Sequence, residues 1–151
     1  MTQKDKRALS IVKDLAKTEV VEKEPEPILV VEDNDVLRKL FITQLQVLKL
    51  SGEEAANGQE AVEAVKKRQY GFILMDVSMP VLDGLDATKI IRQFEEENGR
   101  KRTPIIAVTG ISDRSTCITS GMDDFMNKPF LLEHLRATAA RWLKQAVNSE
   151  P

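Results

Sequence analysis

Two kinds of hydrophobic pattern alternate along the chain from Ile28 onward. Short apolar runs predict buried strands at residues 28–31, 72–75 and 105–108, and a weaker run predicts another at 124–126. Between residues 50 and 56 the pattern is poor. Two successive helices would break the alternation there, so we place a short strand in this stretch as well.

Stretches with apolar residues at helical spacing follow each of these runs and predict five helices. The residues with this spacing are Leu37, Leu40, Phe41, Leu45 and Leu48; Ala61, Val62 and Val65; Ala87, Ile90, Ile91 and Phe94; Cys117, Ile118 and Gly121; and Leu131, Leu135, Ala139, Trp142 and Leu143. Parallel strands joined by right-handed helical crossovers form a sheet with helices on both faces. The pattern therefore predicts an α/β fold with a five-stranded, doubly wound parallel sheet.

The first 27 residues have a different character. Apolar residues at positions 8, 11, 12 and 15 predict a helix, whereas residues 22–27 are rich in glutamate and proline and cannot continue one. We expect an N-terminal helical segment and linker over residues 1–27, one domain over 28–147 and a tail over 148–151. The segment 1–27 should contribute little to the stability of the core.

Length, charge and cysteine content exclude several classes of protein. A chain of 151 residues has the size of one domain, and no apolar run approaches the roughly 20 residues that span a bilayer. A net charge of −2 argues against a broad nucleic-acid-binding face. The single cysteine, Cys117, cannot form an internal disulfide. We expect an intracellular protein without direct contact to membrane or nucleic acid.

Polar residues stand where the predicted strands end, which is where a doubly wound sheet binds ligands. Glu32 and Asp33 follow the first strand, Asp76 the third, Thr109 the fourth and Lys128 the last. Three clustered carboxylates repel one another unless a cation intervenes, and their hard oxygen atoms suit Mg²⁺. These residues predict an Mg²⁺ site at which Asp76 attacks a phosphoryl group, with Lys128 and Thr109 neutralising the charge.

Each of these residues also has a purely structural interpretation. Glu32 and Asp33 are typical of a helix N-terminus, Asp76 of a turn, and Thr109 of an ordinary strand end. The interpretation weakens when the residues are taken together, because independent capping residues need not converge on one edge of a sheet.

Four separated segments resemble the receiver domain of response regulators and hybrid histidine kinases. They are ILVVEDND from residue 28, ILMDVSMP from residue 73 with Asp83-Gly84 after it, AVT from residue 107, and GMDDFMNKPF from residue 121. The resemblance covers about residues 28 to 145 and implies the flavodoxin-like (βα)5 fold.

By resemblance, Asp76 is the phosphoacceptor, and Glu32 and Asp33 bind Mg²⁺ together with Asp76 and the backbone carbonyl of Ser78. The implied contacts to the phosphate come from Thr109 and Lys128. The implied switch residues are Thr109 and Phe125, and the peptide bond between Lys128 and Pro129 is expected to be cis.

Three positions depart from the usual family sequence. Glu32 replaces the more common aspartate, Phe125 lacks the hydroxyl of a switch tyrosine, and Gly110 follows Thr109 where alanine is usual. The implied donor is a histidine kinase dimerisation domain or a histidine phosphotransfer protein. The resemblance further implies a monomeric segment of a hybrid histidine kinase that does not turn over substrate as an enzyme.

Three alternative functions remain. A metal-dependent phosphohydrolase would also form an aspartyl phosphate, but it generally has a second acid two residues after the nucleophile, where this chain has Ser78. A nucleotide-binding switch would need a glycine-rich phosphate loop, and neither common form is found in the sequence. A degenerate receiver kept for docking would not need the full set of phosphate-handling side chains.

Overall fold

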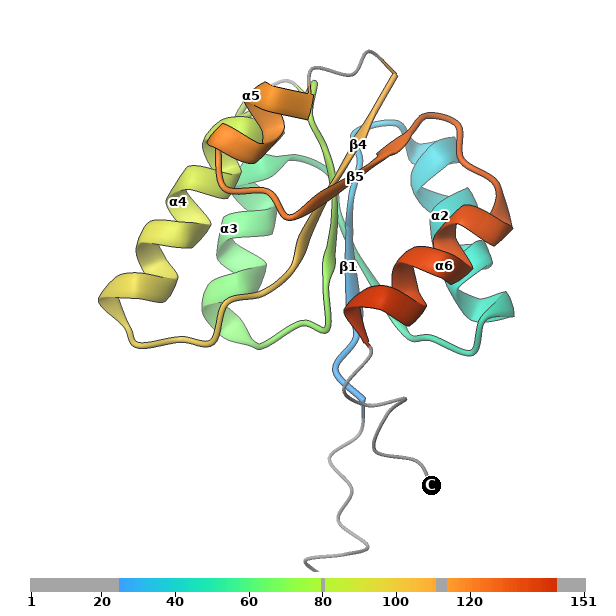
Figure 1. Ribbon diagram of the computed structural model, residues 1–151, viewed down its shortest axis with the longest axis horizontal. Coiled ribbons are helices and arrows are strands. Elements are labelled where there is room, and N and C mark those ends of the chain that lie inside the picture. The colour runs from blue at the N-terminus through green and yellow to red at the C-terminus, as the bar shows by residue number, and fades with distance from the viewer. Residues whose placement is uncertain (1–24, 80, 111–113, 144–151) are drawn as a thin grey trace, which may run out of the picture.

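The computed structural model describes residues 25–79, 81–110 and 114–143, and these form one parallel sheet covered by helices on both faces (Figure 1). The strands are β1 (Ile28–Val31), β2 (Gly52–Ala55), β3 (Ile73–Asp76), β4 (Ile105–Thr109) and β5 (Asp124–Asn127). Their order across the sheet is β2-β1-β3-β4-β5. The predicted five-stranded, doubly wound fold is confirmed, including the short strand between residues 50 and 56.

Helices lie in two groups, one on each face of the sheet (Figure 1). The helices are α2 (Asp35–Val47), α3 (Gly58–Lys67), α4 (Gly84–Glu97), α5 (Arg114–Thr119) and α6 (Leu132–Trp142). The α3, α4 and α5 helices cover one face, and α2 and α6 cover the other. The helix predicted over residues 8–15 and the predicted tail lie outside the described residues. Within the described part of the chain, no helix is long and apolar enough to cross a bilayer.

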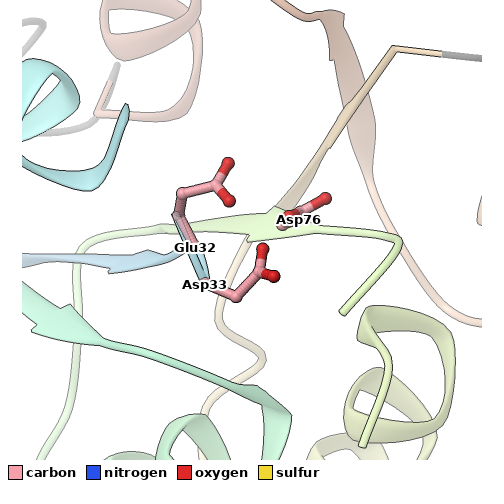
Figure 2. Close-up of side chains that lie close together, drawn as sticks. All are labelled: Glu32, Asp33 and Asp76. Atoms are coloured by element: carbon pink, nitrogen blue, oxygen red, sulfur yellow. The ribbon is translucent and has the colours of Figure 1, made fainter. Parts of the chain in front are cut away.

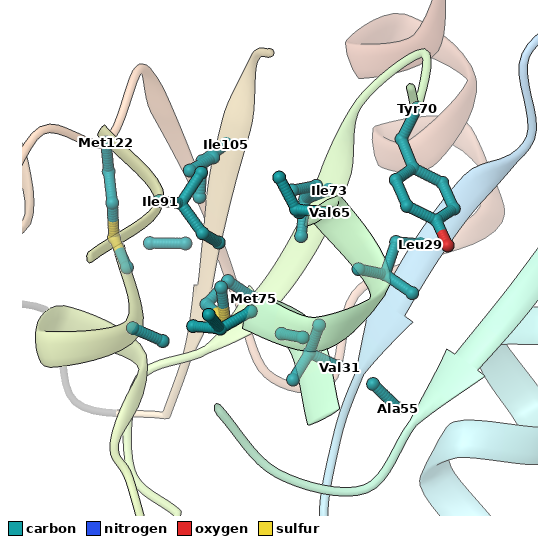
Figure 3. Close-up of a cluster of buried hydrophobic side chains, with 14 of the residues drawn as sticks. Leu29, Val31, Ala55, Val65, Tyr70, Ile73, Met75, Ile91, Ile105 and Met122 are labelled. Atoms are coloured by element: carbon teal, nitrogen blue, oxygen red, sulfur yellow. The ribbon is translucent and has the colours of Figure 1, made fainter. Parts of the chain in front are cut away.

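The core consists of two apolar layers that the sheet separates, and Figure 3 shows the layer beneath α3 and α4. Successive residues of a strand point to opposite faces, so Leu29 and Val31 enter one layer while Ile28 and Val30 enter the other. Because both faces are covered, the central strands read as continuous apolar runs. In the second layer the rings of Phe41 and Phe130 stack with centroids 4.5 Å apart.

Side-chain caps start three of the helices that follow strands. The side chains of Asn34, Asn57 and Asp83 accept hydrogen bonds from the backbone N–H of Leu37, Glu60 and Asp86, respectively. Each bond satisfies one of the free N–H groups at a helix start. Residues 32–34 alone connect β1 to α2, which holds Glu32 and Asp33 close to the end of the strand.

The helical pattern predicted too much burial and too much helix at a few positions. Leu40 and Ile90 lie on the exposed sides of α2 and α4, since one helix buries only part of its circumference. Leu131 precedes α6 and is 68% exposed. Gly121 lies beyond the end of α5 with φ +104°, a conformation that favours glycine and ends the helical pattern.

Candidate functional site

A cavity of about 510 Å³ lies at the carboxyl ends of four strands, where the sequence placed its polar residues. It is lined by Glu32, Asp33, Asn34, Leu37, Asp76, Val77, Ser78, Thr109, Gly110 and Lys128. The lining includes every candidate side chain for metal binding or phosphoryl transfer. Phe125, the remaining candidate, lies on β5 outside this lining.

Three carboxylates converge in the cavity. Glu32, Asp33 and Asp76 each offer an oxygen atom, and these atoms all lie within 4.8 Å of one another (Figure 2). Glu32 and Asp76 are buried, whereas Asp33 is exposed at the mouth. Glu32 and Asp33 directly follow β1, and Asp76 is the last residue of the adjacent strand β3. The parallel pairing of the two strands therefore brings the three residues together.

Lys128 places one ammonium between the two buried carboxylates. Its Nζ atom lies 2.5 Å from Oε1 of Glu32 and 3.1 Å from Oδ2 of Asp76. The Lys128 backbone N–H donates to the carbonyl oxygen of Thr109, and its peptide bond to Pro129 is cis, as the resemblance implied. A single ammonium cannot neutralise three ionised carboxylates, so the site retains a negative charge.

The negative charge affects the protonation of Asp76. Burial raises the pKa of Asp76 to about 7; the neighbouring Glu32 carboxyl also raises it, while the Lys128 ammonium opposes the increase. Burial alone would lower the pKa of Lys128, but its ion pairs with Glu32 and Asp76 outweigh burial and raise it. An added cation would favour the ionised form of Asp76, which is the nucleophilic form.

In the described parts of the chain, local backbone hydrogen bonds engage one oxygen of each buried acid. Oε2 of Glu32 accepts from the backbone N–H of Asn34 at 3.1 Å, and Oδ1 of Asp76 accepts from the N–H of Ser78 at 3.2 Å. These are the bonds that a capping or turn residue would make. The other oxygen of each acid faces Lys128, which the capping interpretation does not explain.

The remaining candidates lie around this group. Thr109 is buried at the end of β4 and pairs in register with Asn127 of β5. Among the described residues, no heavy atom lies within 4 Å of a Cβ atom placed at Gly110. Phe125 is half-buried, and the Arg114 guanidinium lies 5.2 Å from the centre of its ring.

The donor atoms suit a small, hard divalent cation. All three clustered side chains offer carboxylate oxygens, and Mg²⁺ is usually held in proteins by a few carboxylates together with water and phosphate oxygens. Two of the acids are buried and share one ammonium, so a second cation would relieve their repulsion. The residues present therefore fit Mg²⁺.

Sequence reasoning overlooked one residue beside the cavity, Arg38 in the first turn of α2. Its guanidinium donates to the backbone carbonyl of Glu32, the first residue of the acidic pair, at 2.8 Å. A cation in the first turn of a helix is unfavourable, and that position was the available signal.

Comparisons with known proteins identify the family of this chain. A family model described as the response regulator receiver domain matches residues 28–140. The chain is 41% identical over 118 residues to hybrid signal transduction histidine kinase A of Dictyostelium discoideum, and 36% identical over 154 residues to histidine kinase 5 of Arabidopsis thaliana. These matches cover 76% and 85% of this chain but only 6% and 17% of the relatives, so it spans a small part of their length.

Solved structures show the same fold. The receiver domain of the Pseudomonas aeruginosa sensor histidine kinase PA1611, with a magnesium ion coordinated in its active site cleft, is 37% identical with a TM-score of 0.72, covering 80% of this chain and 99% of that one. The receiver domain of Saccharomyces cerevisiae Ssk1, solved with the histidine phosphotransfer protein Ypd1, belongs to a structure matched at 34% identity with a TM-score of 0.75, covering 78% and 88%. Chemotaxis protein CheY4 of Vibrio cholerae matches at 28% identity with a TM-score of 0.70, covering 78% and 98%.

Proposed function

This chain belongs to the response regulator receiver domain family, and on that basis we propose that Asp76 accepts a phosphoryl group from a phosphohistidine in an Mg²⁺-dependent reaction. One observation carries the proposal. Oδ2 of Asp76 lies in the cavity beside the Lys128 ammonium, within a cluster of carboxylates that fits a divalent cation.

The chemistry requires a nucleophile and a way to neutralise charge. A carboxylate oxygen of Asp76 forms the new bond to phosphorus as the donor's phosphorus–nitrogen bond breaks, and the bonding electrons stay on the imidazole nitrogen. Lys128 provides positive charge beside the transferred group, and the Thr109 hydroxyl is proposed to contact a phosphoryl oxygen. Mg²⁺ bound by Glu32, Asp33, Asp76 and the carbonyl of Ser78 would neutralise further charge on the phosphoryl oxygens.

Thr109 and Phe125 are proposed to carry the conformational response. Thr109 lines the cavity, and Phe125 lies on the neighbouring strand, where its ring is only half-buried beside Arg114. Movement of the Thr109 hydroxyl toward the phosphoryl group would leave space into which the Phe125 ring moves. This movement would change the molecular surface that β5, α5 and α6 form at the edge of the sheet. Because Phe125 has no hydroxyl, the signal on this face depends on ring packing.

Intact-mass spectrometry after incubation with acetyl phosphate provides the direct test of the proposed function. We expect the gain of one phosphoryl group per chain with Mg²⁺ and almost none in excess chelator, since the clustered acids repel an anionic donor when no metal is bound. In NMR spectra of the same protein, the backbone chemical shifts of Phe125 should change on phosphorylation. Equal labelling with and without chelator would refute the metal requirement, and shifts confined to the cavity would refute the response at Phe125.

The histidine-bearing partner is proposed to dock on the start of α2. This helix begins beside the cavity, and Val36 and Leu40, four residues apart, present exposed apolar side chains on it. The yeast complex of a receiver domain with a phosphotransfer protein supports a partner of this class, and a kinase dimerisation domain would present its histidine on a similar helix.

Leu40→Glu should slow transfer from a phosphorylated histidine phosphotransfer protein about tenfold, because it puts a charge into an apolar contact. Labelling by acetyl phosphate should stay unchanged. Val47→Glu is the matched control, since Val47 is an exposed residue at the far end of the same helix. If both variants accept phosphate from the protein donor at the wild-type rate, docking on this part of α2 is excluded.

The similarity to hybrid histidine kinases supports a proposal for the wider setting of the chain. We propose that it is a segment of a hybrid histidine kinase, intracellular and monomeric, whose domain occupies residues 28–147. Its own chemistry would be limited to self-phosphorylation and slow loss of the phosphoryl group, without turnover of a separate substrate.

A further inference from the structure

Arg38 uses all three nitrogen atoms of its guanidinium in hydrogen bonds, one of them to the backbone of the acidic pair. Nη1 donates to the backbone carbonyl of Glu32 at 2.8 Å, Nη2 to Oδ1 of Asp35 at 2.6 Å, and Nε to Oε1 of Glu54 at 3.0 Å. The side chain is only 12% exposed. An arginine that donates to three groups loses side-chain freedom and can restrict the arrangement of the groups that it binds.

The placement of this arginine carries a cost. Arg38 lies in the first turn of α2, where the helix dipole disfavours a cation, and its burial removes water from the guanidinium. The nearby carboxylates of Asp35 and Glu54 offset both effects and raise the pKa of Arg38. Leucine and glutamine have about the same helix propensity as arginine and would bring no charge into the first turn, so helix stability alone does not account for Arg38.

These contacts join the loop that bears the acidic pair to the edge of the sheet. Glu54 belongs to β2 and lies opposite Val30 of β1, and its second oxygen accepts from Lys39 at 2.8 Å. Arg38 thus links the last backbone carbonyl before Asp33 to a residue on the neighbouring strand. Lys128 holds Glu32 through its side chain, while Arg38 holds it through its backbone.

We propose that Arg38 is a positioning residue for the divalent cation, acting through the loop on which Glu32 and Asp33 stand; this rests on the metal site of the proposed function. Among the described residues, the Arg38 guanidinium donates to Glu32, Asp35 and Glu54 and makes no bond to Asp76, so its proposed effect on the cation is indirect. Without it, the two acids keep their charge but sample more orientations, so the cation binds more weakly. Residues that orient metal ligands in this indirect way commonly change metal affinity by about 10- to 100-fold.

The test is an NMR titration of the full chain with MgCl₂ and no phosphoryl donor. Arg38→Ala should weaken Mg²⁺ binding about tenfold, and Arg38→Lys should fall between it and wild type because lysine keeps the charge but cannot reach all three acceptors. In labelling with acetyl phosphate, Arg38→Ala should need about tenfold more Mg²⁺ for half-maximal rate. Its rate at saturating Mg²⁺ should lie within about twofold of wild type.

Arg68→Ala is the matched control, because Arg68 pairs with Glu53 on the same strand at 2.6 Å but makes no bond to the acidic loop. It should bind Mg²⁺ as wild type does. If Arg38→Ala does not fold, Glu54→Gln gives the same test, since it removes a charged acceptor of Arg38 and should weaken Mg²⁺ binding in the same direction. The proposal is overturned if the Arg38 and Glu54 variants bind Mg²⁺ like wild type, if Arg68→Ala weakens binding equally, or if wild type shows no Mg²⁺-dependent shifts. Failure of the proposed function looks different: wild type would bind Mg²⁺ without ever gaining a phosphoryl group.

Discussion

Asp76→Asn should abolish phosphoryl labelling and leave the chain folded. Asparagine keeps the size of the side chain and its capacity for hydrogen bonding, but it has no ionisable oxygen to attack phosphorus.

The folded-state pKa of Asp76 lies above the ordinary aspartate value, at about 7, so the wild-type fold loses stability as the pH rises toward and through neutrality. The variant avoids that loss. Its melting temperature at pH 8 in chelator should equal or exceed that of wild type.

Two further variants keep Asp76 and change a neighbouring residue, and the same mass measurement follows their labelling. Lys128→Ala keeps Asp76 but removes the ammonium 3.1 Å from its Oδ2 atom, so labelling should continue about 100-fold more slowly. Thr109→Ala should affect labelling less than the response at Phe125. A phosphoryl mass on the Asp76→Asn protein would show that Asp76 is not the sole acceptor and would end the assignment.

Gly84→Ala should destabilise the fold and disturb the phosphoacceptor together. A Cβ atom at Gly84 would lie 2.1 Å from the backbone carbonyl oxygen of Asp76, which belongs to the rigid end of β3. The Gly84 N–H also donates to the carbonyl of Val77 at 3.0 Å, so the start of α4 is held against this backbone. We expect a loss of about 2 kcal/mol or more in the free energy of unfolding, measured by urea denaturation.

Gly110→Ala is the matched control for this substitution. A Cβ atom there meets no heavy atom within 4 Å in the described parts of the chain, so the free energy of unfolding should change by less than about 0.5 kcal/mol. At Gly84, which lies in α4, helix propensity alone would favour alanine over glycine by about 1 kcal/mol, so a loss of stability there would reflect the close contact. If Gly84→Ala were as stable as wild type or more stable, the close approach of α4 to Asp76 would not exist in solution.

The central strands were predictable from the sequence, whereas β2 was not predictable from its own residues. Strands β1, β3 and β4 bury both faces and therefore appear as apolar runs. The edge strand β2 reads Gly-Glu-Glu-Ala, since its surroundings are charged: Glu53 accepts from Arg68 and Tyr70, and Glu54 from Arg38 and Lys39. Only the alternation of strands and helices indicated it.

The acids of the candidate site were also predictable, because parallel strands necessarily bring their carboxyl ends to one edge. The bond between Asp76 and Lys128 joins residues 52 positions apart, and the strand-end rule still placed both residues at this edge. The contacts of Arg38 follow no such rule. One acceptor is a backbone carbonyl and another, Glu54, lies 16 positions away on a strand with no clear pattern. Long-range polar pairs of this kind need the folded structure.

The hydrophobic pattern of β1 does little to fix the register of this strand in the sheet, because the core has an apolar layer on each side of it. Both faces of Ile28–Val31 are apolar, so sliding the strand by one residue would exchange the layers without exposing a hydrophobic side chain. The same slide would carry Glu32 into the place of Val31, where an unpaired carboxylate costs on the order of several kcal/mol. The acid that ends the strand therefore penalises the misaligned fold. A residue proposed to bind metal also helps select the one sheet alignment in which that metal can be bound.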